Sequence, residues 1–207
     1  LHPAGPYKAL HYQGFLYLKG ELDLHGANIN MDMMKLGLAS ISPKIYVKDN
    51  ASLYNSDSLI YSYDTGVEIF LPTGKKLELN AVSPGRQKYP GAIRVAGEVT
   101  ITGGGRLDIT YTLINTESGT TPRTLFGIYG GNGVTLRGSE NHGTGPTVNI
   151  KMDSGAFGPE ANDVVGIRSG GDLIIKGDSK VKIEMLGHKL GQTTTEEDVN
   201  RAITAKR

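Results

Sequence analysis

The chain has 207 residues, and its 22 Lys and Arg side chains are balanced by 21 Asp and Glu side chains, which leaves a formal net charge of +1 at pH 7. A balanced chain has no field that would draw it onto nucleic acid or an anionic membrane, and no apolar run approaches the roughly 18 residues of a membrane span. The absence of cysteine excludes a disulfide scaffold and a thiolate metal site, and it suits a secreted protein. We therefore expect one domain, outside the cell or at its surface, with no nucleic-acid partner and no membrane insertion.

Residues 1–20 are rich in aromatic side chains and precede the regular pattern of the chain. They begin with Leu1 rather than Met, as in a processed or excised chain. Open strand edges recruit other chains unless something covers them. We expect residues 1–20 to form an N-terminal cap over the first strands of the segment that follows.

Residues 21–186 repeat a unit of short apolar alternations, separated by bends rich in Gly, Asn and Asp. Taking the second apolar residue of each alternation as an anchor gives steps of 23, 24, 30, 35 and 39 residues. The anchors are Leu24, Val47, Leu71, Ile101, Leu136 and Ile175. Two positions before them stand Leu22, Ile45, Ile69, Val99, Val134 and Leu173. All of these residues are aliphatic, and their period of two predicts β-strands.

Further aliphatic rows complete each unit. Six positions after an anchor stand Leu53, Leu77, Leu107 and Val181, with Val148 in the same role after an insertion. Eight positions after an anchor stand Leu79, Ile109 and Ile183, with Ile150 displaced in the same way, and eight positions before an anchor stand Ile93, Ile128 and Ile167. No unit can bury these rows alone, but stacked units place them in a common interior. The pattern predicts an all-β fold, a right-handed single-stranded parallel β-helix of about six coils with three short strands per coil. The steps are too long for a β-sandwich.

Residues 187–207 differ again in composition. Thr194 and Glu197 have the spacing of a capping box, with acidic residues early and basic residues late. We expect a short C-terminal helix that caps the last coil, or a linker.

Three long connections leave the same corner of the predicted coil, within residues 80–92, 110–127 and 151–166. Loops on a rigid scaffold are the usual place for binding. The last of them contains an acidic cluster, formed by Asp153, Glu160, Asn162 and Asp163. Oxygen ligands of this kind suit calcium, so we predict calcium as a cofactor of this cluster; the alternative is a set of solvated loop acids.

A second candidate site is the row one position after three inward isoleucines, formed by Arg94, Tyr129 and Arg168. These side chains should point outward and stack in register, so that the ring faces a sugar and the guanidinium groups pair with carboxylates. Tyr89 and Arg123, in the preceding loops, complete the candidate carbohydrate-binding set. An ordinary surface ladder would have the same pattern.

Two other rows have structural explanations. Tyr46 and Phe70 should stack as outward neighbours, with Tyr61 and Tyr63 nearby, and such aromatic pairs stabilise sheets as well as bind sugars. A basic line of Lys76, Arg106 and Lys180 fits a solvated face. The sequence contains none of the common nucleophile, phosphate-loop or zinc motifs, so no catalytic residue is assigned.

The segments "GAIRVAGEVTITGGGRLDIT", "FGIYGGNGVTLRG" and "VGIRSGGDLIIKGDSKVKIEM" carry a family likeness. They resemble the GI-x-x-x-GD-L-x-I-x-GG repeats of secreted, carbohydrate-binding β-helix proteins of mostly Gram-positive bacteria, which are related in shape to pectate lyases. The likeness spans about residues 59–185, and Gly97, Gly133, Gly171 and Asp172 match the repeat. It implies a right-handed parallel β-helix, extracellular placement, binding of plant-type or acidic polysaccharide, and calcium in some members.

We therefore predict a non-catalytic extracellular module that binds polysaccharide. Two alternatives stay open. A β-helix with exposed ends can associate end to end as a subunit of a surface filament or an adhesin stalk. A pectate-type lyase would use Arg94 and Arg168 near Asp163, whereas polygalacturonase-type hydrolysis is disfavoured because no Asp-Asp pair occurs.

Overall fold

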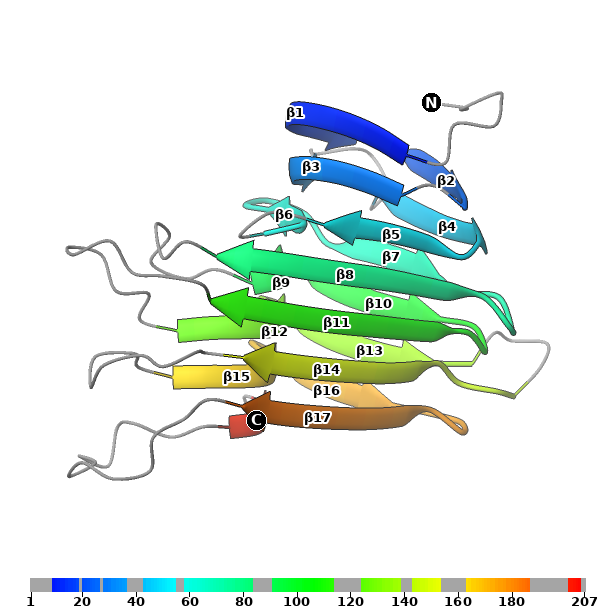
Figure 1. Cartoon of the computed structure of the whole chain (residues 1–207). Helices are drawn as coiled ribbons and strands as arrows, with labels where there is room; N and C mark the ends of the chain where they lie inside the picture. The colour runs from blue at the N-terminus through cyan, green and yellow to red at the C-terminus, as the bar shows by residue number, and fades with distance from the viewer. Residues whose placement is uncertain are drawn as a thin grey trace.

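A computed structural model describes residues 9–18, 20–26, 28–36, 43–54, 58–83, 91–113, 124–138, 143–153, 163–186 and 201–205. In these ranges the chain forms β-strands and no helix, and neighbouring strands of every pair are parallel. The strands stack from the N-terminal end to the C-terminal end as a solenoid whose coils turn in a right-handed sense (Figure 1). The predicted parallel β-helix is confirmed.

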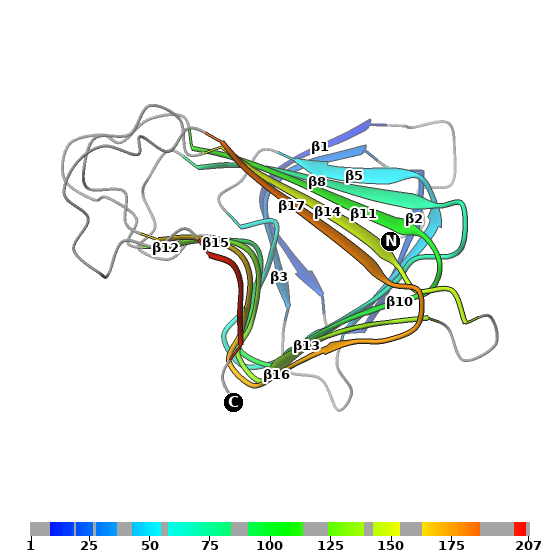
Figure 2. The same ribbon diagram turned by 90° about the horizontal axis from the view of Figure 1, so that it is seen from below.

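Each complete coil contributes one strand to each of three walls. The first wall contains β2 (Glu21–His25), β4 (Lys44–Asp49), β7 (Val67–Phe70), β10 (Glu98–Thr102), β13 (Gly133–Arg137) and β16 (Asp172–Ile175). The second wall contains β5 (Ala51–Tyr54), β8 (Lys76–Ser83), β11 (Arg106–Leu113), β14 (Thr147–Asp153) and β17 (Lys180–Leu186). The third wall contains β6 (Ile60–Ser62), β9 (Gly91–Val95), β12 (Thr124–Gly130), β15 (Asp163–Ser169) and β18 (Arg201–Ala205). Seen along the axis, the walls enclose a three-sided interior (Figure 2).

The N-terminal end joins two of the walls. Strand β3 (Asn28–Leu36) pairs with β5 at its beginning and with β6 near its end, so it spans the second and third walls. Strand β1 (Ala9–Leu18) pairs with β3 along its length. The part of residues 1–20 that is described is therefore a further strand of the stack.

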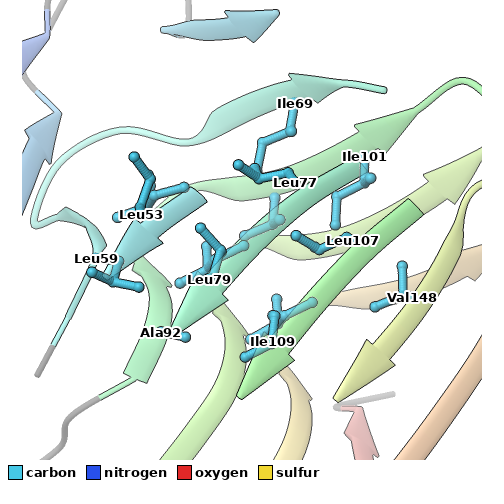
Figure 3. Packing of buried hydrophobic residues seen from close by; sticks show 14 of the residues in the cluster. Leu53, Leu59, Ile69, Leu77, Leu79, Ala92, Ile101, Leu107, Ile109 and Val148 are labelled. Carbon is cyan, nitrogen blue, oxygen red and sulfur yellow. The ribbon is translucent and has the colours of Figure 1, made fainter. Parts of the chain in front are cut away.

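Aliphatic ladders fill the interior (Figure 3). In the first wall one ladder runs through Val67, Val99, Val134 and Leu173. In the second wall a ladder runs through Leu53, Leu79, Ile109, Ile150 and Ile183. In the third wall a ladder runs through Ile60, Ile93, Ile128, Ile167 and Ile203. Burial is complete or nearly so in the middle coils and partial in the last described coil, formed by β16, β17 and β18.

The stacking register corrects the predicted alignment of the early anchors by two residues. Ile69, rather than Leu71, lies beside Ile101. Since strand side chains alternate with period two, a shift of two keeps every side chain on the same face, and the apolar pattern does not reveal it. Gly103 lies next to Leu71, with a φ of 97°, and a Cβ there would be 2.2 Å from the Leu71 carbonyl oxygen. In the first wall the early coils therefore stack with each other as predicted, but two residues out from their predicted alignment with the later coils. In the second wall Leu77 lies beside Leu107 as predicted, whereas Leu53 lies beside Leu79 and not, as predicted, beside Leu77.

The C-terminal end differs from its prediction. Residues 201–205, expected in a helix or linker, form β18, which pairs in parallel with β15. Ile203 lies beside Ile167 and continues the ladder of the third wall. Thr194 and Glu197, which carry the capping-box signal, lie outside the described residues.

Candidate functional site

The third wall bends sharply, and the bend creates an outer corner (Figure 2). In β12 both Leu125 and Ile128 belong to the core, although their positions differ by three, so the alternation of a flat strand is broken between them. Gly127 lies at the break, where a Cβ would be 2.6 Å from the carbonyl oxygen of Gly166 and 2.7 Å from Cγ2 of Ile150. Only glycine fits this close approach of two coils.

Because of the bend, Phe126 and Tyr129 lie together outside the core. Their ring centroids are 5.1 Å apart. Phe126 is 3% exposed but is not part of the core cluster. It is therefore an apolar floor of the outer corner rather than a core residue.

The predicted row of Arg94, Tyr129 and Arg168 occupies three adjacent coils in register. Tyr61 stands beside Arg94 in the preceding coil and extends the row, so that aromatic and guanidinium side chains alternate. We call these four residues the corner row. Exposure rises along it, since Tyr61 is buried, Arg94 and Tyr129 are half-buried and Arg168 is exposed. The sequence analysis missed Tyr61 and Phe126 as parts of this surface.

The guanidinium groups of the corner row lie over aromatic rings. Cζ of Arg94 is 5.5 Å from the ring centroid of Tyr61. Cζ of Arg168 is 5.7 Å from the centroid of Phe126 and 6.0 Å from that of Tyr129. Among the described residues no carboxylate forms a salt bridge with Arg168. Stacking restricts both long side chains, and the guanidinium group of Arg168 is exposed to solvent, where an anion can reach it.

Tyr61 is a neutral member of the row. Its ring meets that of Tyr63 edge-on, with centroids 4.5 Å apart and planes at 86°. Its buried hydroxyl makes no hydrogen bond within the described part of the chain. Burial, and next the neighbouring Tyr63, raise the pKa of Tyr61 above its usual range.

Several predicted site residues are placed only in part. Tyr89, Arg123, Glu160 and Asn162 lie outside the described residues. Of the proposed calcium ligands, Asp153 ends β14 and Asp163 begins β15, at the two ends of one connection. No cluster of three or more His, Cys, Asp or Glu side chains suited to a metal occurs within the described ranges. Calcium binding stays a prediction.

The outer face of the second wall holds a shallow groove of about 550 Å³. Its charges are largely paired with one another. The Arg106 Nε donates to Asp108 Oδ1 at 2.7 Å, and the Asn149 Nδ2 donates to the same oxygen at 2.8 Å. Lys76 pairs with Glu78 in the same way. The basic line predicted through Lys76, Arg106 and Lys180 is interrupted by Thr147, which lies between the last two.

Tyr46 and Phe70 are neighbours across β4 and β7, as predicted, with ring centroids 6.1 Å apart. The Tyr46 hydroxyl donates to Glu21 at 3.3 Å, which gives the ring a partner within the sheet. Tyr61 belongs to the third wall and to the corner row, and Tyr63 packs against it, so neither contributes to this pair. The arrangement favours a stabilising cross-strand pair.

Comparisons with protein-family models, with curated proteins and with solved structures give no significant match. The described residues include no helix of the length and apolar character required to cross a membrane. The functional assignment therefore depends on the geometry of the corner row.

Proposed function

We propose that this protein is an extracellular, non-catalytic module that binds acidic polysaccharide through the corner row. The observation that carries the proposal is the placement of Arg94 and Arg168 on aromatic rings at one outer corner. Acidic residues repeat along a uronate-containing chain, and guanidinium groups bind carboxylates through paired hydrogen bonds. The lack of cysteine and the family likeness support a secreted location.

The spacing of the two arginines fits a repeating ligand. They lie two coils apart, and adjacent strands are about 4.8 Å apart, so the separation is about 10 Å along the axis. This length is comparable with a disaccharide. A polysaccharide aligned with the solenoid axis would present one carboxylate to each arginine, with the Tyr129 ring between them.

The corner row is a better candidate than the groove of the second wall. In the groove, Arg106 and Asp108 already satisfy each other, so an acidic ligand would have to break an existing ion pair. At the corner, Arg168 needs no such exchange with any described carboxylate. Binding of an acidic ligand at the corner therefore costs less free energy than binding in the groove, because no such ion pair has to be broken.

Affinity electrophoresis of the full chain tests the proposal. Gels containing polygalacturonate or alginate should retard the protein, whereas a neutral soluble cellulose derivative should not. A parallel set with EDTA tests whether the proposed calcium ions contribute. Unchanged mobility in every acidic gel would refute polysaccharide binding, and the appearance of an unsaturated uronide product would instead identify a lyase.

A further inference from the structure

The turn that follows β6 carries two exposed side chains beside the corner row. Tyr63 is 73% exposed, which makes it the most exposed large hydrophobic residue within the described part of the chain. Asp64 comes next and is exposed as well. An aromatic ring and a carboxylate are therefore offered to solvent together, next to Tyr61, the first member of the corner row.

This turn is a bulge in the stack of coils. The backbone N–H of Ala96 donates to the Ser62 carbonyl oxygen at 3.0 Å, and the N–H of Gly97 donates to the Thr65 carbonyl oxygen at 3.0 Å. The two donors are consecutive in the chain, whereas two residues separate the two acceptors. The separating residues are the exposed pair, which therefore has no counterpart in the next coil.

Ser62 holds the bulge in place. This residue is buried, and its Oγ accepts hydrogen bonds from the backbone N–H groups of Asp64, at 3.2 Å, and Thr65, at 3.0 Å. The same hydroxyl donates to Asp64 Oδ1 at 3.0 Å. The Tyr63 ring meets Tyr61 edge-on, with centroids 4.5 Å apart. Both exposed side chains are thus positioned before a ligand arrives, so little conformational entropy is lost on binding.

Tyr61 connects the exposed pair with the arginines. Its ring centroid is 4.5 Å from that of Tyr63 and 5.5 Å from Cζ of Arg94. The exposed ring and the guanidinium group are therefore within the length of a disaccharide of each other. Strand β6 precedes β9 in the third wall (Figure 1). A polysaccharide bound along the corner row would reach Tyr63 with the sugar next to the one held by Arg94.

We propose that Tyr63 and Asp64 form a subsite for an uncharged pyranose ring that adjoins the uronate bound by Arg94. This subsite rests on the proposed function, because Arg94 supplies the neighbouring contact. The C–H face of a sugar packs on an aromatic ring, and the hydroxyl groups at its edge donate to a carboxylate. A uronate in the same place would bring a second negative charge close to Asp64, and like charges repel. The ligand class is therefore a polysaccharide in which a neutral sugar adjoins an acidic one.

Isothermal titration calorimetry of the full chain with two hexasaccharides tests the subsite. Hyaluronate alternates glucuronate with an uncharged acetylated amino sugar, whereas every sugar of hexagalacturonate is acidic. We expect Tyr63→Ala to lower the affinity for the hyaluronate hexasaccharide about three- to tenfold, with a smaller effect on hexagalacturonate. Tyr63→Phe should retain the affinity, because the ring remains. Tyr46→Ala, which removes a ring from the first wall, is the matched control and should change neither affinity.

Asp64→Asn gives a second measurement, because its effects on the two ligands should have opposite signs. The affinity for hexagalacturonate should rise about two- to fivefold, since the repulsion disappears. The affinity for the hyaluronate hexasaccharide should fall, since an amide oxygen is a weaker acceptor than a carboxylate. The asparagine oxygen can still accept the hydrogen bond from Ser62, so the bulge is kept.

Arg168→Gln separates this inference from the proposed function. If Arg168→Gln weakens binding of the hexasaccharides but Tyr63→Ala weakens neither, the subsite is refuted and the corner row stands. If Asp64→Asn shifts both affinities in the same direction, the subsite does not select an uncharged sugar and the proposal is wrong. If neither hexasaccharide binds the original chain, the subsite and the proposed function are both refuted.

Discussion

Arg168 stacks on Tyr129 across neighbouring coils, with Cζ 6.0 Å from the ring centroid and the two residues paired in register between β15 and β12. Phe126 supports the same guanidinium at 5.7 Å. The cation is thus held by two rings of one strand while it is exposed to solvent. This contact is what distinguishes the corner row from the charge pairs elsewhere on the surface.

Removing that cation should weaken binding of acidic polysaccharide. We expect Arg168→Gln to reduce affinity for polygalacturonate about tenfold, because a charge-assisted hydrogen bond contributes about 1.5–3 kcal/mol. The affinity of Arg168→Lys should lie between those of the original chain and Arg168→Gln, since an ammonium group keeps the charge but lacks the planar fork. The matched control is Arg106→Gln in the second wall. An equal loss in both glutamine variants would mean that overall charge, not the corner row, controls binding.

The close approach at Gly127 should make this position intolerant of a side chain. We expect Gly127→Ala to destabilise the protein by about 1–3 kcal/mol, since the new methyl group would meet backbone of the next coil. Gly20→Ala is the control, because no atom lies within 4 Å of its Cβ position. Urea unfolding followed by circular dichroism measures both. Equal midpoints for the two variants would show that the bend at Gly127 relaxes freely.

Position along the stack should determine the cost of deleting a core side chain. Ile101 and Ile175 belong to one ladder of the first wall, joined through Leu136. Ile101 is fully buried and Ile175 is 43% exposed. We expect Ile101→Ala to cost about 2–5 kcal/mol and Ile175→Ala less than about 1 kcal/mol in urea unfolding. A similar cost at both sites would show that the difference in burial between Ile101 and Ile175 does not control stability.

Tyr61 should make stability fall at alkaline pH. Burial and Tyr63 raise the pKa of Tyr61 in the folded chain. Below about pH 10, the ordinary pKa of tyrosine, the hydroxyl therefore keeps its proton in both the folded and the unfolded chain. Above that pH the unfolded chain loses the proton while the folded chain keeps it, and stability declines by at most about 1.4 kcal/mol per pH unit.

The variant Tyr61→Phe should remove this part of the decline. At neutral pH it should be as stable as the original chain or more so, because the buried hydroxyl makes no hydrogen bond among the described residues. Tyr46, whose pKa is also raised by burial and by Glu21, should keep a residual slope. Urea midpoints at pH 7 and about pH 10.5 measure the difference. An unchanged slope would show that Tyr61 titrates normally when folded.

Much of the fold is predictable from the sequence because one physical requirement repeats in every coil. The rows through Val99, Val134 and Leu173 were predicted in adjacent coils and lie there. The two-residue error at Leu71 and Ile69 was not detectable from alternation, since either alignment keeps aliphatic residues inside. Register there depends on the backbone turn at Gly103.

The candidate site was predictable only in part. Arg94, Tyr129 and Arg168 follow inward isoleucines and could be placed by counting. Phe126 is apolar, as core residues are, and its outward position results from the bend at Gly127. The available signal was the spacing of three between Leu125 and Ile128, which a straight strand does not allow. Tyr61 lies in a three-residue strand, too short to show alternation.

Each coil pairs only with the coil before it and the coil after it, from β2 through β16 in the first wall. A chain that emerges with its N-terminus first can therefore complete its turns in order, and each finished turn is the template on which the next one forms. The surface exposed at any moment is the most recent rung. The apolar rows of that rung are then the surface on which the following turn folds.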